Sequence, residues 1–398
     1  MRTRKFAAVA AGLTLTFALA ACGGGGAGSG GDDEAPDEGT GDEAAEPADD
    51  GADADTSDLT VGVAMPTQTS ERWIADGDAV QSQLEEAGYS VDLQFANDDI
   101  PTQTQQIDQM ITQGVDLLII ASIDGTALTS QLDAAGAADI PVIAYDRLIN
   151  GSENVDFYVT FDNYNVGVQQ ATSLLVGLGV LNEDGSEGDA SGPFNIEVFA
   201  GSPDDNNAGF FFNGAMDTLD PYIEDGTLVV TSGQTDFDTV ATLRWSQEAA
   251  QRRMEDLITS TYGGGSGELH GVLSPFDGIS RGVITALQGA GYGPSIEEGL
   301  PIVTGQDAEI ASVTLIDQGV QFATIFKDTR KLATQAVTAA DAYLSGGEPE
   351  ANDTETYDNG VKVVPSYLLE SDIVYASNIG ELLVDSGYYT EEQVESGQ

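Results

Sequence analysis

Residues 101–121 read PTQTQQIDQMITQGVDLLIIA, and this stretch indicates the fold class. Pro101 stands at a helix start, where its missing N–H costs nothing. The apolar residues that follow share one helix face: Ile107, Met110 and Ile111. Gly114 is suited to end that helix, and Asp116–Ala121 then gives a nearly continuous apolar run, typical of a strand buried on both faces. A helix followed directly by such a strand predicts a parallel sheet covered by helices.

The same alternation extends in both directions along the chain. Toward the N-terminus it predicts a strand at Leu59–Met65, a helix at Glu71–Ala87 and a strand at Val91–Ala96. A helix through Leu128 and Leu132 and a strand at Pro141–Tyr145 come next. Later strands are predicted at Phe194–Ala200, Thr227–Ser232, Gly271–Ser274, Pro301–Thr304, Gln321–Phe326 and Lys362–Leu369, with helices around 208–219, 240–260, 279–290, 309–318 and 329–345. Two such runs predict an α/β protein with two doubly wound parallel-sheet lobes.

Composition excludes several classes of function. The chain has 398 residues, with 13 Lys and Arg against 67 Asp and Glu. Nucleic acid and anionic lipid both require clustered Lys and Arg, so neither is expected as an electrostatic partner. The single cysteine, Cys22, rules out a disulfide within the chain, and the single histidine, His270, rules out a histidine-rich metal site. We expect no metal and no cofactor.

The first 57 residues carry signals for export rather than for a fold. A basic start precedes the apolar run Ala7–Ala21, which is shorter than the roughly 20 residues that span a membrane. The run ends at Leu19-Ala-Ala-Cys22, which resembles a bacterial lipoprotein signal: residues 1–21 would be removed and Cys22 lipidated. An ordinary secretory signal with a chance cysteine is the alternative. Residues 22–57 contain no aromatic or large aliphatic residue and are predicted to form a disordered acidic tether.

The residues that follow each predicted strand are candidates for a binding site, because ligands of parallel sheets bind beyond the carboxyl ends of the strands. Thirteen basic residues less Arg2, Arg4 and Lys5 leave ten for the fold. Three of these ten stand at strand ends: Arg72, Arg147 and Lys327. The chain's two tryptophans, Trp73 and Trp245, each follow an arginine directly. Acidic and amide residues in equivalent positions are Asn97, Asp98, Asp99, Asp124, Asp146, Asp204, Asp205, Asn206, Asn207, Asp277, Gln306, Asp307 and Asp328.

These residue types suit a monosaccharide. Planar Asp, Asn and Arg groups make paired hydrogen bonds to adjacent hydroxyls, and aromatic rings stack on the apolar C–H faces of a sugar ring. One tryptophan from each lobe could therefore sandwich the ring. The alternatives are structural: Asp98, Asp99, Asp124 and Asp328 could equally cap helices, and Trp245 could belong to the core.

Seven longer motifs carry a family resemblance: Ser70-Glu-Arg-Trp73, Ala144-Tyr-Asp-Arg-Leu148, Phe161-Asp-Asn163, Gly201-Ser-Pro-Asp-Asp-Asn-Asn-Ala208, Ser274-Pro-Phe-Asp-Gly278, Gly305-Gln-Asp-Ala308 and Phe326-Lys-Asp328. With these, residues 58–398 resemble the type I periplasmic sugar-binding proteins. Within that family the chain is most similar to the xylose-binding and multiple-monosaccharide-binding proteins that supply ABC importers.

The resemblance implies two lobes, 58–161 plus 329–356 and 162–328 plus 357–398, joined by three crossovers. The hinge would include Asp162, Asn163 and Asp328, with a third crossover near Glu355–Gly360 and the strand Lys362–Leu369 in the second lobe. The sugar contacts that it implies are Arg72, Trp73, Asp146, Arg147, Asn206, Asn207, Trp245, Asp277, Asp307 and Lys327. Family members often have Asn where this chain has Phe276, a departure that favours a broad aldose binder over a narrow pentose binder.

The implied function is capture rather than chemistry. A monomeric, lipid-anchored protein outside the cell membrane would close its lobes on an aldose such as xylose, glucose, galactose or arabinose and deliver it to an ABC permease. A sensor subunit that presents the closed form to a membrane receptor, and a nucleoside-binding lipoprotein, are the alternatives. A glycoside hydrolase is disfavoured, because Arg and Lys between the acids would hold them ionised.

Overall fold

The computed structural model describes residues 56–265 and 267–398. The predicted signal peptide, Cys22 and most of the tether lie outside these residues. The last two residues of the predicted tether belong to a short 3-10 helix, Thr56–Asp58. Among the described helices, none is both long and apolar enough to cross a membrane.

The first lobe is built on a six-stranded parallel sheet with the order β11-β5-β4-β3-β1-β2. Its strands are β1 (Thr60–Met65), β2 (Ser90–Phe95), β3 (Leu117–Ile120), β4 (Val142–Tyr145), β5 (Phe157–Phe161) and β11 (Ser366–Leu369). Its helices are α1 (Glu71–Glu86), α2 (Ile100–Gln113), α3 (Thr129–Ala137) and α10 (Thr329–Leu344).

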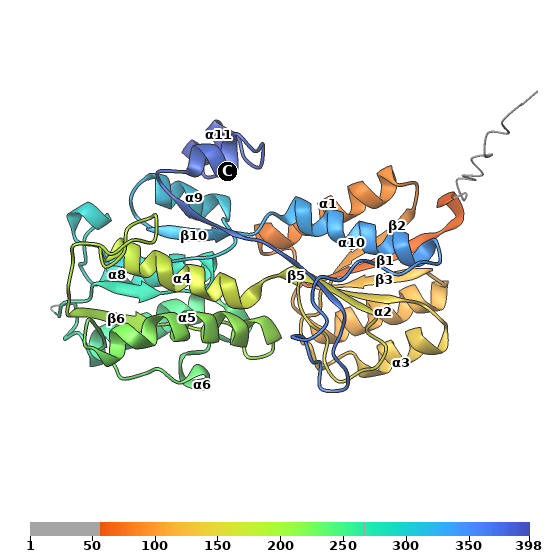
Figure 1. Cartoon of the computed structure of the whole chain (residues 1–398), viewed down its shortest axis with the longest axis horizontal. Helices are drawn as coiled ribbons and strands as arrows, with labels where there is room; N and C mark the ends of the chain where they lie inside the picture. Colours follow the sequence, from red (N-terminus) through yellow and green to blue (C-terminus); the bar gives the residue numbers. More distant parts are fainter. Residues whose placement is uncertain (1–55, 266) are drawn as a thin grey trace, which may run out of the picture. The chain divides into compact units, whose positions relative to one another are not determined.

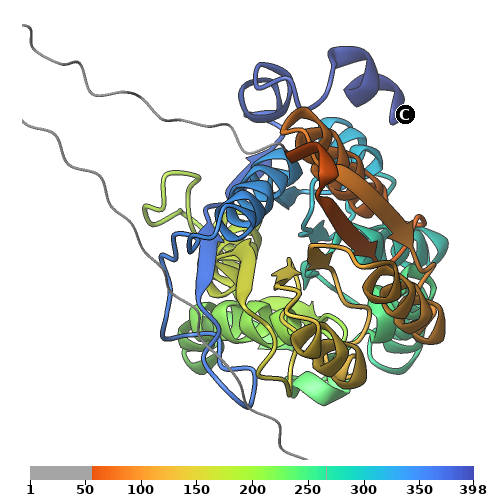
Figure 2. The same cartoon turned by 90° about the vertical axis from the view of Figure 1, so that its right-hand side faces the viewer.

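Helices cover both faces of this sheet. Val61 and Val63 on β1 pack in one cluster with α1 and α10, whereas Ala64 packs in another with α2 and α3. Figure 1 shows the two helix pairs on opposite sides of the strands, and Figure 2 shows the orange α1 beside the blue α10. Burial on both faces explains why the central strands β3 and β4 are apolar throughout, whereas the edge strand β2 alternates polar and apolar residues.

The second lobe contains a four-stranded parallel sheet, β7-β6-β8-β9, and the antiparallel pair β10–β12. Its strands are β6 (Phe194–Val198), β7 (Leu228–Val230), β8 (Gly271–Leu273), β9 (Ile302–Val303), β10 (Ala323–Phe326) and β12 (Asp372–Tyr375). Its helices are α4 (Asn163–Gly177), α5 (Asn206–Glu224), α6 (Phe237–Val240), α7 (Gln247–Ser260), α8 (Asp277–Gly289), α9 (Ile310–Asp317) and α11 (Glu391–Ser396). Short 3-10 helices lie at Leu243–Trp245 and Ile296–Glu298, and a short π-helix lies at Gly380–Val384. α4 and α5 pack with β6 in one cluster, and α7 and α8 pack together in another.

The predicted α/β class with two parallel sheets is confirmed. Four strands and helices were not predicted from the sequence: β5, α4, which follows it directly, β12 and α11. The helix predicted around 240–260 is broken, because Arg244 and Trp245 have left-handed φ values of 58° and 54°. α6 therefore ends before this turn and α7 begins after it.

The predicted position of the third crossover is wrong. β11 pairs with β5 in the first lobe, and β12 pairs with β10 in the second. The chain therefore crosses between Leu369 and Asp372, and not near Glu355–Gly360. The strand that we placed in the second lobe instead extends the first sheet, because β5 would otherwise expose an unpaired edge. The remaining lobe boundaries stay predictions.

Candidate ligand-binding site

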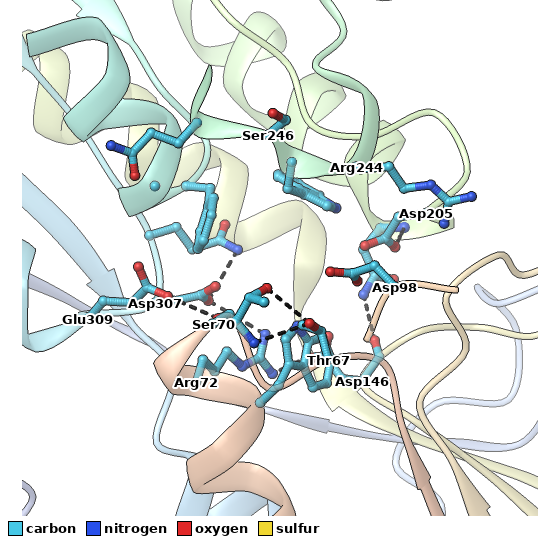
Figure 3. Close-up of a pocket in the computed structure, with 18 of the residues that line it drawn as sticks. Thr67, Ser70, Arg72, Asp98, Asp146, Asp205, Arg244, Ser246, Asp307 and Glu309 are labelled. Carbon is cyan, nitrogen blue, oxygen red and sulfur yellow. Dashed lines mark hydrogen bonds and ion pairs between the residues drawn. The ribbon is translucent and has the colours of Figure 1, made fainter. Parts of the chain in front are cut away.

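A cavity of about 400 Å³ lies between the two lobes, at the carboxyl ends of the parallel strands. The first lobe contributes Thr67, Thr69, Ser70, Arg72, Trp73, Asp98, Asp146 and Arg147. The second contributes Asp205, Asn207, Phe211, Arg244, Trp245, Ser246, Gln247, Phe276, Gly278, Arg281, Gln306, Asp307, Glu309 and Lys327. Figure 3 shows Thr67, Ser70 and Arg72 on one side facing Ser246 and Arg244 on the other. Eight of the ten predicted contacts line the cavity; Asn206 and Asp277 do not.

Unusual backbone conformations are concentrated at this cavity. Eight residues other than glycine have positive φ values among the described residues, and five of them line it: Asp98, Asp146, Arg244, Trp245 and Asp307. Such conformations cost on the order of 1–3 kcal/mol each and persist only where the surroundings fix them. Because these conformations are clustered at the cavity, we infer that they orient side chains there, at a cost in local backbone stability.

Arg72 is the centre of a buried charge network. Its guanidinium pairs with Asp146, with Asp76 at 3.1 Å from Nε and with Asp307 at 3.5 Å from Nη1. Burial alone would lower the pKa of Arg72, but these carboxylates outweigh it and raise the pKa well above its usual value. Arg72 therefore stays charged, with two of its three partners at the cavity wall.

Lys327 completes the same network from the second lobe. Its ammonium nitrogen lies 2.9 Å from Oδ1 of Asp307, and only 2% of its side chain is exposed. Burial would raise the pKa of Asp146, but Arg72 and Lys327 together hold it below its usual value. Asp146 is therefore an ionised hydrogen-bond acceptor at the cavity.

Other polar contacts join the lobes beside the cavity. Nε of Arg147 forms an ion pair with Asp205 at 3.2 Å. The Tyr158 hydroxyl donates to Oδ1 of Asn207 at 2.8 Å, and Nδ2 of Asn207 donates to the Asp146 carbonyl at 2.5 Å. Asn207 thus bridges the lobes as well as lining the cavity.

Aromatic rings supply the apolar part of the wall. Trp245 lies edge-on to Phe211 and to Phe276, with ring centroids 6.2 and 6.0 Å apart. The Trp73 ring lies under two guanidinium carbons, those of Arg72 at 4.8 Å and Arg147 at 4.9 Å. Trp73 therefore helps to hold the two arginines in addition to lining the cavity.

Gly201 provides the space for the Trp245 ring. A Cβ at residue 201 would lie 2.0 Å from Cη2 of Trp245, so the rigid ring would have to move.

We expect Gly201→Ala to weaken binding of the predicted monosaccharide about tenfold, through loss of the ring's stacking position. Calorimetric titration and tryptophan emission would measure both effects. Gly289→Ala is the matched control, since nothing lies within 4 Å of its added Cβ. Wild-type affinity and emission in Gly201→Ala would show that the ring does not depend on this glycine.

Asp277 points away from the cavity, into the second lobe. Its carboxylate accepts from the Glu309 amide at 2.9 Å and from Nε2 of Gln321 at 2.9 Å, and the residue is fully buried. Burial, with a contribution from Glu309, raises the pKa of Asp277 to about 8. It therefore anchors the loop that presents Asp307 and Glu309.

Asn206 is the other predicted contact that does not line the cavity. It is the first residue of α5, is half-buried and lies next to the bridging residue Asn207.

The predicted hinge residues have local structural partners. Asp162 caps α4 by accepting from the Asn165 amide, and Asp328 caps α10 while pairing with Arg330. Nδ2 of Asn163 donates to Thr160 and to the Tyr357 hydroxyl, both at 3.2 Å. The sequence left two alternatives for Asp328, a binding-site residue or a helix cap, and the structure shows the cap.

Several lining residues were not among the predicted contacts. Asp205 and Gln306 stand at strand ends and were candidates by the strand-end rule, but they were not among the contacts that the family resemblance implied. Arg281 lies within α8 and reaches Glu309 at 2.6 Å, and no sequence signal marks it. Phe211 lies on α5, and Phe276 immediately precedes α8.

The expectation that basic neighbours keep the pKa values of the site's acids from rising holds only in part. It holds for Asp146, but burial raises the pKa of Asp205 and of Glu309 despite Arg147 and Arg281. Within the two described ranges, no three His, Cys, Asp or Glu side chains are grouped to hold a metal ion.

Comparison with known proteins gives consistent results. The family model for the periplasmic binding protein domain matches residues 61–348. The multiple sugar-binding periplasmic receptor ChvE of Rhizobium radiobacter is 53% identical over 335 residues, 84% of this chain and 92% of the relative. The D-xylose-binding periplasmic protein of Haemophilus influenzae is 34% identical over 341 residues, 86% of this chain and 93% of the relative. An ABC transporter solute-binding protein of Clostridium phytofermentans, solved with bound β-D-glucose, has a TM-score of 0.78 and 49% identity, covering 84% of this chain and 99% of that one.

Proposed function

This chain belongs to the type I periplasmic sugar-binding family, a family of binding proteins rather than enzymes, and we propose that it captures a neutral aldose between its two lobes. We further propose that it is anchored outside the cell membrane through Cys22 and delivers the sugar to an ABC importer. Relatives named as a multiple sugar-binding receptor and as a glucose-bound ABC transporter protein support a broad aldose range.

The observation that carries the proposal is the charge balance of the cavity. Its lining contains five basic and five acidic side chains, although acids outnumber bases in the whole chain by 67 to 13. Each basic side chain is paired: Arg72 with Asp146, Arg147 with Asp205, Arg244 with Asp204, Arg281 with Glu309 and Lys327 with Asp307. An anionic ligand would find no unpaired cation in this lining, whereas neutral hydroxyls can hydrogen-bond to both partners of such pairs.

The aromatic wall supplies the second half of the recognition. A sugar ring has apolar C–H faces, and Trp245 with Phe211 and Phe276 offers a surface of matching character. Nε1 of Trp245 is buried without a hydrogen-bond partner in the described residues. A ligand oxygen that accepts from it would recover the free energy of an unmade hydrogen bond.

Lobe closure is the proposed mechanism of capture. Ser70 donates to Glu309 at 3.0 Å, and the Ile310 amide donates to Glu71 at 3.1 Å, so the first turn of α1 meets the start of α9 across the cleft. With the contacts of Asn207 and Arg147, these bonds close the cavity from two sides. A sugar that touches both lobes adds contacts available only in this closed form and so shifts the population toward it.

A titration series tests the ligand class. Residues 23–398 would be titrated by calorimetry and tryptophan emission with glucose, galactose, xylose, arabinose, ribose, glucose 6-phosphate and adenosine. Saturable binding of one or more aldoses, with glucose 6-phosphate excluded, is the expected result. Binding of adenosine alone would replace the sugar by a nucleoside, and strong binding of the phosphate would contradict the charge argument.

Anchoring and partner need separate measurements. In a bacterial host, the full chain should partition into the membrane fraction, and Cys22→Ala should release it into the soluble extracytoplasmic fraction. Sugar-dependent binding to a reconstituted ABC permease would support delivery. Binding only to a membrane sensor kinase would favour the alternative role as a sugar-sensing subunit.

A further inference from the structure

A buried carboxylate lies directly behind Arg72. Asp76 is one helical turn further along α1, is 0% exposed and does not line the cavity. Its Oδ2 accepts from Nε of Arg72 at 3.1 Å. The terminal nitrogens of Arg72 meanwhile face Asp146 and Asp307, both of which line the cavity. Asp76 therefore holds one edge of the guanidinium on the side away from the cavity, and the other edge faces the cavity.

Asp76 is itself fixed by a second buried group. The hydroxyl of Tyr145 donates to Oδ1 of Asp76, and Tyr145 is fully buried on β4. Both carboxylate oxygens are thus engaged, one by the strand and one by the arginine. Since the guanidinium is planar, the bond at Nε, together with those to Asp146 and Asp307, restricts its orientation relative to the cavity.

We propose that Asp76 is a positioning residue for the ligand site, holding the Arg72 guanidinium in the orientation that ligand binding requires, with Tyr145 fixing Asp76 in turn. This inference rests on the proposed function, because it assigns a role in binding to a residue that cannot touch the ligand.

The balance of charge around Arg72 makes this role sensitive to pH. Two buried cations, Arg72 and Lys327, share three buried carboxylates: Asp76, Asp146 and Asp307. Tyr145 on β4 and Tyr388 in the C-terminal segment also face Asp76. Burial raises the pKa of Asp76 to about 7, against the opposing effect of Arg72. Asp76 therefore changes charge near neutral pH, whereas Asp146 stays ionised.

The sign of the expected effect follows from the hydrogen bond at Nε. An ionised Asp76 accepts a charge-assisted bond from Arg72, which is stronger than the bond to a protonated carboxyl. Ligand affinity should therefore rise as the pH rises from 6 to 8. The free energy of unfolding should change in the opposite direction. The stabilisation that comes from the raised pKa of Asp76 is fully present below the ordinary pKa of an aspartate, near 4, and is lost as the pH rises through about 7.

Asp76→Asn is the decisive variant, since it keeps the shape and an oxygen acceptor but cannot ionise. With the aldose found in the titration series, we expect about tenfold weaker binding at pH 8, equivalent to about 1.4 kcal/mol, and an affinity that no longer changes between pH 6 and 8. Tyr145→Phe should give a smaller loss. The matched control is Asp341→Asn, because Asp341 on α10 also accepts from a tyrosine, Tyr89 at 2.6 Å, away from the cavity. It should keep both the affinity and the pH profile.

A readout without ligand separates this inference from the proposed function. In a Trp245→Phe background Trp73 is the chain's only tryptophan, and its ring lies 4.8 Å from the Arg72 guanidinium carbon. Its emission should change between pH 6 and 8, and this change should disappear when Asp76→Asn is added. No binding of any aldose by the wild type would overturn the proposed function alone. A wild-type affinity and pH profile in Asp76→Asn, or an emission change that persists there, would overturn the positioning role.

Discussion

Arg72→Ala is expected to weaken sugar binding about 100-fold or more and to lower the stability of the chain. The substitution leaves Asp76, Asp146 and Asp307 without their shared cation in a site where the arginine side chain is only 4% exposed. Removing one partner of a buried pair costs about 3–5 kcal/mol, because the remaining charge stays desolvated. In affinity this corresponds to a loss of about 100-fold or more. Calorimetric titration and urea unfolding would measure the two effects.

Two further variants guard against loss of folding as the explanation. Arg72→Lys keeps the charge but not the planar fork, so it should fold and bind about tenfold or more weakly. Arg252→Ala removes an arginine whose pair with Glu248 is exposed, 60% and 80% respectively, and should change stability by less than about 1 kcal/mol. Near wild-type affinity in Arg72→Lys would mean that the site needs only a positive charge at this position.

Gly167→Ala is expected to be among the most destabilising single-methyl additions in the second lobe. Gly167 on α4 faces α5 so closely that its added Cβ would lie 2.0 Å from the Phe211 carbonyl oxygen and 2.9 Å from the Ala215 amide nitrogen. Backbone atoms cannot move aside without separating the helices. Overpacking of this kind typically costs about 1–3 kcal/mol and occasionally more. Urea unfolding would measure the shift, and sugar affinity should fall as well, since α5 carries Asn207 and Phe211.

Gly209 on the same helix α5 is the control. Nothing lies within 4 Å of a Cβ built there, so Gly209→Ala should be neutral or should stabilise the chain by up to about 1 kcal/mol. If the two substitutions had equal effects, close packing of α4 on α5 would not be what Gly167 provides.

The fold was predictable where burial follows a simple period. Residues 101–121 gave both a helix stripe and a fully buried strand, and α2 and β3 are found there. α4 was missed because its sequence lacks a clean stripe: it buries polar and small residues, such as Gln170 and Gly167, next to leucines. Its helical form depends on packing against α5 rather than on amphipathic periodicity.

The sequence predicted which types of residue form the site, but it identified only some of the individual residues that line it. Strand ends identified Arg72, Asp146 and Lys327 because the carboxyl ends of parallel strands meet at one edge. Asp277 satisfied the same rule, yet its side chain turns into the lobe to hold the Glu309 amide. Adjacent residues in a loop can point in opposite directions, and a strand-end rule does not distinguish them.

The sequence by itself determined the α/β class, most of the element order and the chemical character of the site, because these follow from local periodicity and from the few basic residues available. Only the tertiary structure decided which side chains meet. It paired β11 with β5, turned Asp277 away from the cavity and placed Asp76 behind Arg72. These outcomes depend on contacts between residues far apart in the chain and on left-handed turns such as Arg244–Trp245, whose local cost is repaid only by the packing around them.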